Sequence, residues 1–133
     1  MKFSYTLLTK NDRNAIYQIF ELIKRNPEDC FSIPSEIYER DRGSRVIIYN
    51  NRITLLNLCH LELTEIPEGV EKLGALEFLE LHDNKITEIS ETIFYLNNLK
   101  MLNVLGNPIS EQSKDLLRRL LKKGVGVSCY NLL

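Results

Sequence analysis

The apolar positions of residues 53–109 recur with a fixed period. In the segment 76–86, LEFLELHDNKI, leucines at 76, 79 and 81 are followed by an asparagine at 84. The segments 53–63, ITLLNLCHLEL, and 99–109, LKMLNVLGNPI, show the same pattern, so the period is 23 residues (53 to 76, and 76 to 99). Repeats of this length indicate stacked units, because one unit is too small to bury its own apolar face.

Each unit predicts one strand and one turn. In Leu-x-Leu the two leucines lie two residues apart, so on a strand they share one face. Asn84 and Asn107 follow the strand where the chain must turn, while the first unit has Leu61 in that position. Asparagine tolerates unusual backbone angles and its amide can bond to the backbone. Burial without partners would cost roughly 1–3 kcal/mol, so we expect a hydrogen-bonded asparagine ladder.

The N-terminal flank carries a helical period over residues 10–25, with Asn11 or Thr9 as the N-cap. Asn26-Pro27 is expected to stop this helix, and residues 34–39 are expected to form a short one. The apolar stripe of the first helix consists of Ile16, Ile19, Phe20 and Ile23.

A hairpin is predicted between this flank and the first repeat. Residues 46–49 are β-branched or aromatic, and Asn50-Asn51 suits a two-residue turn. We expect an antiparallel strand that folds onto the first repeat strand and seals the N-terminal edge of the sheet.

A second helix is predicted over residues 110–123. Ser110 is the expected N-cap, with Ser113 as an alternative, and Gly124 ends the helix. Residues 125–127 are expected to add a short strand to the sheet edge. The apolar stripe consists of Leu116, Leu117, Leu120 and Leu121.

Residues 53–109 resemble the leucine-rich repeat family, whose motif is Leu-x-x-Leu-x-Leu-x-x-Asn-x-Leu. The motif is matched by Leu76, Leu79, Leu81, Asn84 and Ile86, and again by Leu99, Leu102, Val104, Asn107 and Ile109. The 23-residue unit, with Ile66-Pro67 before Val70 and Leu73, is similar to the intracellular class.

The resemblance implies an α/β fold: a short right-handed solenoid with a curved parallel sheet on its concave side and helical or irregular segments on its convex side. We divide the chain into an N-terminal helical capping segment, 1–45, and a repeat domain, 46–133. The repeat domain comprises a hairpin cap at 46–52, repeats at about 53–75, 76–98 and 99–109, and a C-terminal cap at 110–133.

Composition narrows the class of protein. The chain has 133 residues and a net charge of −1, which gives no electrostatic argument for nucleic acid or anionic membrane as a partner. No apolar run approaches the ~20 residues of a membrane-spanning helix, and the N-terminus lacks a signal-peptide core. Cys30, Cys59 and Cys129 are odd in number and far apart, so we expect a reducing compartment, the cytoplasm.

The family resemblance implies a binding module whose concave face carries the residues between the motif leucines. The expected protein-binding residues are Leu55, Asn57, Cys59, Phe78, Glu80, His82, Asp83, Met101, Asn103 and Leu105. Leu55, Phe78 and Met101 align into an apolar row beside a polar one, which is typical of a partner site. The alternative is that the N-terminal segment or a second copy of the chain covers this row.

Two other kinds of site, a thiol nucleophile and a zinc site, have less support in the sequence. Cys59 with His60 or His82 resembles a nucleophile pair, but no third orienting residue is evident. Zinc prefers three or four ligands, whereas the sequence supplies two, with Asp83 as a less suitable third candidate. We therefore expect a surface cysteine and histidine, with no metal and no cofactor. The basic residues of 114–123 are expected to form the solvated face of a capping helix, although a phosphate or acidic partner is the alternative.

The sequence thus predicts a small, non-catalytic intracellular module that binds another protein through its concave face, as a monomer or weak homodimer. The alternatives are a self-associating structural solenoid and, from a different class, a thiol-dependent enzyme that uses Cys59 and His82.

Overall fold

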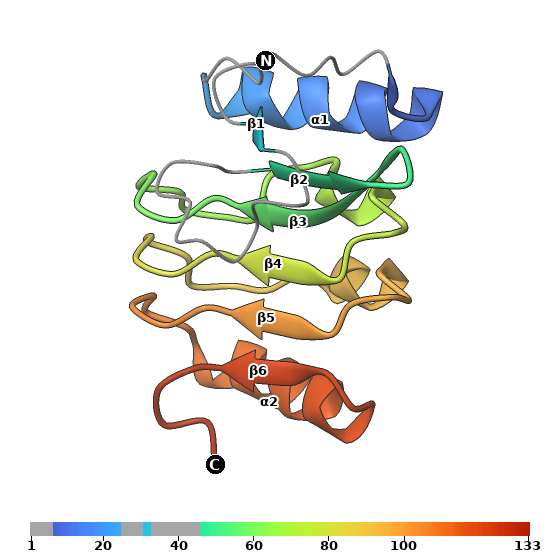
Figure 1. Cartoon of the computed structure of the whole chain (residues 1–133). Helices are drawn as coiled ribbons and strands as arrows, with labels where there is room; N and C mark the ends of the chain where they lie inside the picture. The colour runs from blue at the N-terminus through green and yellow to red at the C-terminus, as the bar shows by residue number, and fades with distance from the viewer. Residues whose placement is uncertain (1–6, 25–30, 33–45) are drawn as a thin grey trace.

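The computed structural model describes residues 7–24, 31–32 and 46–133. Within them a single sheet has the strand order β1-β2-β3-β4-β5-β6 (Figure 1). The strands are β1 (Phe31–Ser32), β2 (Val46–Tyr49), β3 (Arg52–Asn57), β4 (Phe78–Glu80), β5 (Met101–Asn103) and β6 (Gly126–Ser128). The helices are α1 (Lys10–Leu22), α2 (Glu111–Lys122) and the 3₁₀ helices η4 (Val70–Lys72) and η5 (Glu91–Tyr95).

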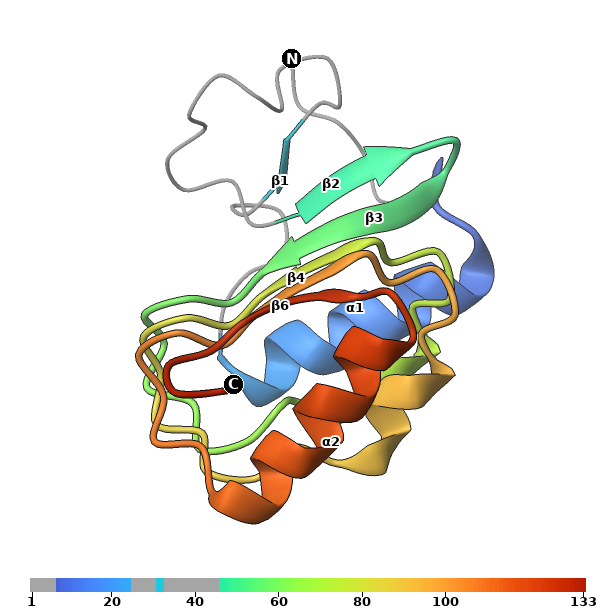
Figure 2. The same ribbon diagram turned by 90° about the horizontal axis from the view of Figure 1, so that it is seen from below.

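The predicted repeat is confirmed as a stack of coils. Strands β3, β4 and β5 pair in parallel, with Leu55 opposite Phe78 and Phe78 opposite Met101. Each coil contributes one strand to the sheet and runs back along the other side (Figure 2). The coils of β3 and β4 return through η4 and η5, and the coil of β5 returns through α2. This is the parallel sheet, with helical segments behind it, that the sequence predicted.

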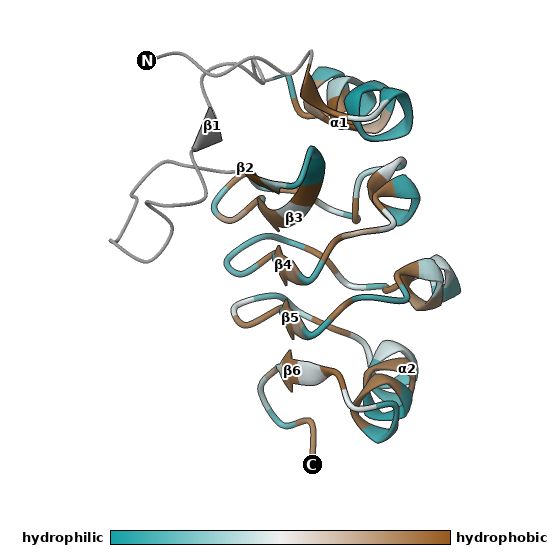
Figure 3. Ribbon diagram, turned by 45° about the vertical axis from the view of Figure 1, so that its right-hand side comes forward, coloured by the Kyte–Doolittle hydropathy of each residue, from teal (hydrophilic) through white to brown (hydrophobic). Residues whose placement is uncertain are grey.

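The core lies between the sheet and these returning segments. Most motif residues of successive coils are buried, because each packs against the equivalent residue of the next coil. The strand members Leu56, Leu79 and Leu102 are fully buried. Both brown and teal appear on α1 and α2 in Figure 3, as expected for helices with one apolar face.

Helix α1 lies on the convex side, where it contacts η4. The Thr9 hydroxyl accepts a hydrogen bond from the Asp12 backbone N–H at 3.3 Å, so Thr9 is the N-cap. The helix ends at Leu22, earlier than the predicted residue 25, because Lys24 adopts a left-handed φ of 57°. Residues 26–27 and the predicted helix at 34–39 lie outside the described residues.

The hairpin is confirmed, with one difference. Asn50 and Asn51 have φ values of 50° and 62°, as a tight two-residue hairpin turn requires, and β2 pairs antiparallel with β3. However, β2 does not seal the sheet, because β1 pairs with it in parallel on the other side. The end of the sheet is therefore the two-residue strand β1.

The C-terminal cap is close to the prediction. The Ser110 hydroxyl accepts from the Ser113 N–H at 3.1 Å, so Ser110 is the N-cap and Ser113 is not. Buried Ser113 instead accepts a hydrogen bond from the Ile89 N–H at 2.8 Å. The last strand begins at Gly126, one residue later than predicted, since the Val125 N–H is still bonded to the Leu120 carbonyl.

Among the described residues, no helix is both long enough and apolar enough to cross a membrane.

Candidate functional site

The residues between the motif leucines form a concave strip on β3, β4 and β5. All ten residues expected to bind protein lie in the described part of the chain, and each is at least partly exposed. Leu55 and Phe78 are partly buried, and Met101 is 43% exposed. Because α1 lies on the convex side, that helix does not cover the apolar row.

The apolar row ends against β6. Gly126 pairs with Met101, and a Cβ atom on Gly126 would lie 2.7 Å from the Met101 Sδ. The missing side chain lets the Met101 thioether pack over the last strand. The flexible thioether can adapt to a ligand surface, which suits a contact residue.

The polar row is held by its own hydrogen bonds. The Asn103 amide donates to Glu80 Oε2 at 3.0 Å, and this fixes the carboxylate between two strands. The side-chain oxygens of Asn57 and Asn103 accept from the N–H groups two residues on, at 3.0 Å for Cys59 and 3.1 Å for Leu105. These asparagines therefore shape the strand ends as well as face the concave side.

Each strand is followed by a residue with left-handed backbone angles. His60, Asp83 and Gly106 occupy the same slot of successive repeats and have φ values of 56°, 57° and 74°. A Cβ atom on Gly106 would clash with the Asp83 carboxylate where it now lies, so a side chain at Gly106 would require Asp83 to move. The small residue thus leaves room for Asp83 on the neighbouring turn.

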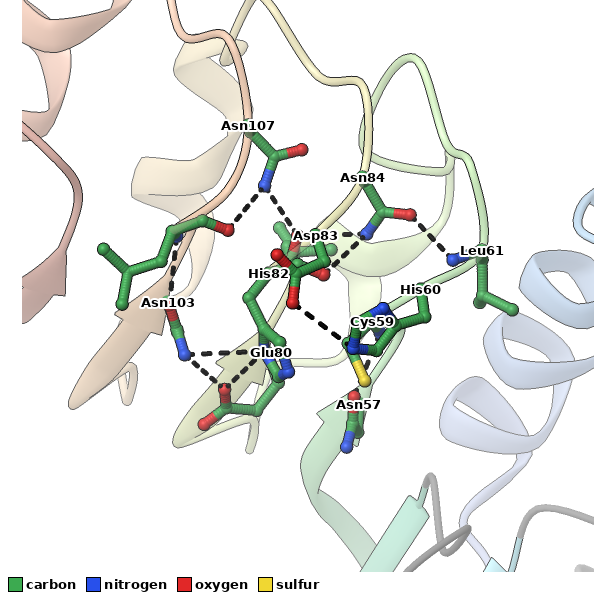
Figure 4. Close-up of polar contacts among 12 residues, drawn as sticks. Asn57, Cys59, His60, Leu61, Glu80, His82, Asp83, Asn84, Asn103 and Asn107 are labelled. Carbon is green, nitrogen blue, oxygen red and sulfur yellow. Dashed lines mark hydrogen bonds and ion pairs between the residues drawn. The ribbon is translucent and has the colours of Figure 1, made fainter.

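The asparagines next in sequence link the coils (Figure 4). The Asn84 carbonyl oxygen accepts from the N–H groups of Leu61 and Leu63, both at 3.0 Å. Its amide donates to the carbonyls of Leu58 at 2.9 Å and Leu81 at 3.0 Å. The bonds to Leu58, Leu61 and Leu63 therefore join the second repeat to the first.

Asn107 repeats this arrangement one coil later. Its oxygen accepts from the Ile86 N–H at 3.0 Å, and its amide donates to the carbonyls of Leu81 at 2.9 Å and Val104 at 3.1 Å. The ladder bonds run to the preceding coil, and among the described residues no repeat coil precedes the first one. This explains why Leu61 can stand in its asparagine slot.

Just after the first two repeat strands, β3 and β4, a cysteine sulfur atom and two histidine rings lie close together. The Cys59 Sγ and one ring nitrogen each of His60 and His82 lie within 4.8 Å of one another. The two rings meet edge to face, with centroids 5.6 Å apart and an interplanar angle of 87°. A carboxylate stands beside each ring: Asp83 Oδ2 is 3.2 Å from His60 Nε2, and Glu80 Oε2 is 3.4 Å from His82 Nδ1.

Sequence reasoning paired Cys59 with either His60 or His82, and placed Cys59 beside His82, but it did not bring all three residues together. On a regular strand, His60 would point away from its neighbour. Its left-handed backbone instead turns the ring back over the cluster. The available signal was that the two histidines of the chain occupy adjacent slots of successive repeats, His60 in the slot of Asp83 and His82 in the slot of Cys59.

The remaining cysteines give no second thiol centre within the described residues. Neither Cys59 nor Cys129 is disulfide-bonded, and Cys30 lies outside those residues. Burial raises the pKa of the Cys129 thiol, and nearby Lys114 and Arg118 only partly oppose this effect. Cys129 is thus a less reactive thiol than an ordinary one.

The basic residues of α2 are largely matched by acidic ones. Arg119 pairs with Glu91 at 3.2 Å, and Lys114 pairs with Glu111 at 3.3 Å. Arg119 also lies over the Phe94 ring, 4.8 Å from its centroid. These contacts support the expectation of a solvated capping face over that of a phosphate site.

Comparison with known proteins identifies the repeats. Residues 51–109 match the family model described as leucine rich repeat. A leucine-rich repeat protein of Leptospira interrogans is structurally similar, with 27% identity and a TM-score of 0.51. That match covers 65% of this chain but only 25% of the other, so this chain spans about a quarter of its length.

A second solved structure is the leucine-rich repeat ectodomain of the receptor kinase SOBIR1 from Arabidopsis thaliana. It is 15% identical with a TM-score of 0.39, and the match covers 92% of this chain and 93% of the other. This likeness is too weak to support an argument. No curated protein matches the sequence.

Proposed function

Because the chain is a leucine-rich repeat protein, we propose that it is a non-catalytic module that binds another protein through its concave strip. Domains of this family generally bind proteins. The observation that carries the proposal is the row of Leu55, Phe78 and Met101, which leaves apolar side chains accessible beside a fixed carboxylate, Glu80. Monomeric soluble proteins rarely expose large contiguous apolar patches, so an accessible apolar row is typical of a surface that a partner covers.

The strip indicates the chemistry of the partner. Phe78 sits between Leu55 and Met101, so an apolar side chain of the partner would lose most of its contact with water there. Glu80 is held at the border of this row and favours a hydrogen-bond donor or a cation on the partner. We also propose a cytoplasmic location and membership of the intracellular class, supported by the odd number of cysteines and the 23-residue unit.

The test is capture from an extract of the source cells with two matched double variants. The concave variant is Phe78→Ala with Glu80→Lys. The control variant is Tyr95→Ala with Glu68→Lys, which makes the same type of change at exposed positions outside the strip. A captured protein is then purified and titrated against all three chains.

We expect the native chain and the control to bind alike. The concave variant should bind at least about 30-fold more weakly, because a central aromatic contact typically contributes about 2 kcal/mol or more. Equal binding by the concave variant, with melting temperatures unchanged, would overturn the proposal. Light scattering over a range of concentrations tests the alternative of self-association, which predicts a dimer that the concave variant abolishes.

A further inference from the structure

We propose that Cys59, His60 and His82 form a zinc-binding site at the rim of the concave strip. The proposal does not depend on the proposed protein partner, because it concerns the metal alone. It rests on three ligand-type side chains from two adjacent coils and on the carboxylates that orient two of them.

The ligand set is chemically suitable. Zinc is bound in proteins by thiolate sulfur and imidazole nitrogen, and sites with three protein ligands keep a fourth position for water. Sγ of Cys59 and one nitrogen of each ring already lie within 4.8 Å of one another. Tetrahedral zinc would hold such atoms roughly 3.4–3.6 Å apart, given metal–ligand bonds of about 2.0–2.3 Å. Rotation of exposed His60 can supply the difference of about 1 Å.

The backbone fixes where these side chains begin. The His60 N–H donates to the His82 carbonyl at 3.3 Å, which joins the two turns directly. The Cys59 N–H is held by the Asn57 side chain at 3.0 Å. The ligands therefore start from anchored positions, and little chain entropy has to be lost to bring them together.

Each histidine has a carboxylate at one ring nitrogen, and in the proposed site the other ring nitrogen would bind the metal. Asp83 contacts Nε2 of His60, and Glu80 contacts Nδ1 of His82. A metal-bound histidine usually donates its second ring N–H to such a carboxylate, which fixes the tautomer and the ring orientation. Glu80 is itself held by the Asn103 amide, and Asp83 occupies the space that Gly106 leaves. The support around the ligands thus extends into the third repeat.

The site is confined to the first two coils. The slots equivalent to Cys59 and His60 are His82 and Asp83 in the second repeat, but Leu105 and Gly106 in the third. A third coil with the same residues would have extended the cluster, whereas Leu105 closes it. On binding, the Cys59 thiol releases its proton to solvent, and the two imidazoles bind as neutral ligands.

The first test is titration of the full chain with zinc in competition with a chromophoric chelator of micromolar affinity. Substitution by cobalt reports the ligand type, because a thiolate ligand gives a charge-transfer band in the near ultraviolet. We expect one metal ion per chain and a thiolate band. Cys59→Ser should remove the band and weaken zinc binding at least about tenfold, and His82→Gln should weaken it similarly.

The controls separate this site from the other thiols. Cys129→Ser and Cys30→Ser should leave both the band and the affinity unchanged. Asp83→Asn should weaken zinc binding by about tenfold or more while the band persists, since Asp83 positions His60 without binding the metal. His60→Gln changes an exposed side chain, so it tests the site even if Cys59→Ser disturbs the fold.

Absence of competition by the native chain, or equal binding by Cys59→Ser and His60→Gln, would overturn the proposal. Loss of the band in Cys129→Ser or Cys30→Ser would also overturn it. Because no protein partner takes part, failure here would leave the proposed protein-binding function untouched.

Discussion

At the residue scale, Asn84 shows how one side chain can join two coils of a solenoid. It is buried, and both its amide and its carbonyl oxygen bond to backbone groups of its own coil or the one before. These backbone groups belong to turns, where no strand ladder can satisfy them. The single side chain of Asn84 therefore supplies hydrogen-bond partners for several backbone groups that would otherwise have none.

We predict that Asn84→Ala lowers the free energy of unfolding by roughly 2–3 kcal/mol, because it leaves buried backbone groups without partners. The measurement is urea unfolding followed by circular dichroism. Asn98→Ala is the matched control, since Asn98 makes one exposed bond, to the Gly74 carbonyl at 2.8 Å. The control should cost less than about 1 kcal/mol. Similar losses in both variants would contradict the ladder's stabilising role.

The Cys129 thiol gives a prediction about pH. Burial raises its pKa, and only the thiolate reacts with alkylating reagents. In a chain with Cys30→Ser and Cys59→Ser, the pH midpoint of iodoacetamide alkylation should be higher in the folded protein than in urea. Between the ordinary thiol pKa and the higher pKa of folded Cys129, the folded protein holds the thiol proton more tightly than the unfolded chain does. The free energy of unfolding should therefore fall as the pH rises through this interval. Equal midpoints would contradict this prediction.

The positions of the asparagines were predictable from the sequence, whereas the cluster at His60 was not. Asn84 and Asn107 recur at the repeat period just after each strand, and turn chemistry then predicts their bonds. The place of His60 depends on a backbone φ of 56°, a value that few residues other than glycine adopt and that the apolar period does not specify. Periodicity gives the slot of a residue but not the dihedral angle that aims its side chain.

At the scale of elements, the cap residues and the hairpin turn were predictable because their signals are local. Ser110, Gly124 and Asn50-Asn51 each match a short-range rule of backbone chemistry. The link between α1 and the sheet was not predictable, since it joins residues 40 positions apart. Asp12 lies in the first turn of α1, where an acidic residue is common at the surface, yet it is fully buried.

Asp12 joins α1 to the first repeat strand. Its carboxylate accepts from Arg52 Nε at 3.0 Å and Nη2 at 3.2 Å, and from the Ile53 N–H at 2.9 Å. We predict that Asp12→Asn costs about 2 kcal/mol, because hydrogen bonds to charged groups contribute about 1.5–3 kcal/mol. Amide hydrogen exchange in α1 should rise, since the helix is held at this point.

The matched control is Asp115→Asn, the same substitution in an exposed pair with Arg118 on α2. Exposed pairs contribute little to stability, so this variant should unfold like the native chain. If Asp12→Asn also leaves stability and α1 exchange unchanged, the helix is held by its apolar face alone, through Ile16, Ile19 and Phe20.

For the whole molecule, the repeat period decided the architecture in advance. A 23-residue unit with Leu-x-Leu leaves each strand beside its equivalent in the next coil, and the observed registers follow this spacing. The side of the solenoid on which α1 packs was not fixed by any pattern. On that side Ile19 and Gln18 pack against Gly69, where an added Cβ would lie 3.3–3.4 Å from both. Such contacts are properties of the assembled surface.

The stacking of coils also predicts how the molecule unfolds. Leu79 is fully buried in the central strand, β4, between the coils of β3 and β5. Leu79→Ala should lower the free energy of unfolding by about 3 kcal/mol, within the usual range for a buried leucine. In a solenoid each coil contacts only its neighbours, so the stabilities of α1 and α2 are coupled through the central coil that contains β4.

Amide hydrogen exchange of α1 and α2 in the Leu79→Ala variant tests this idea, with Leu133→Ala, at a fully exposed position, as the control. We expect the protection of both helices to fall together, because three coils are too few for either end to remain folded alone. If α2 kept native protection while α1 lost it, the C-terminal coils would form an independent unit. The concave strip would then cross a boundary between two units instead of lying on one rigid surface, and a ligand that spans the strip would stabilise the whole molecule by joining them.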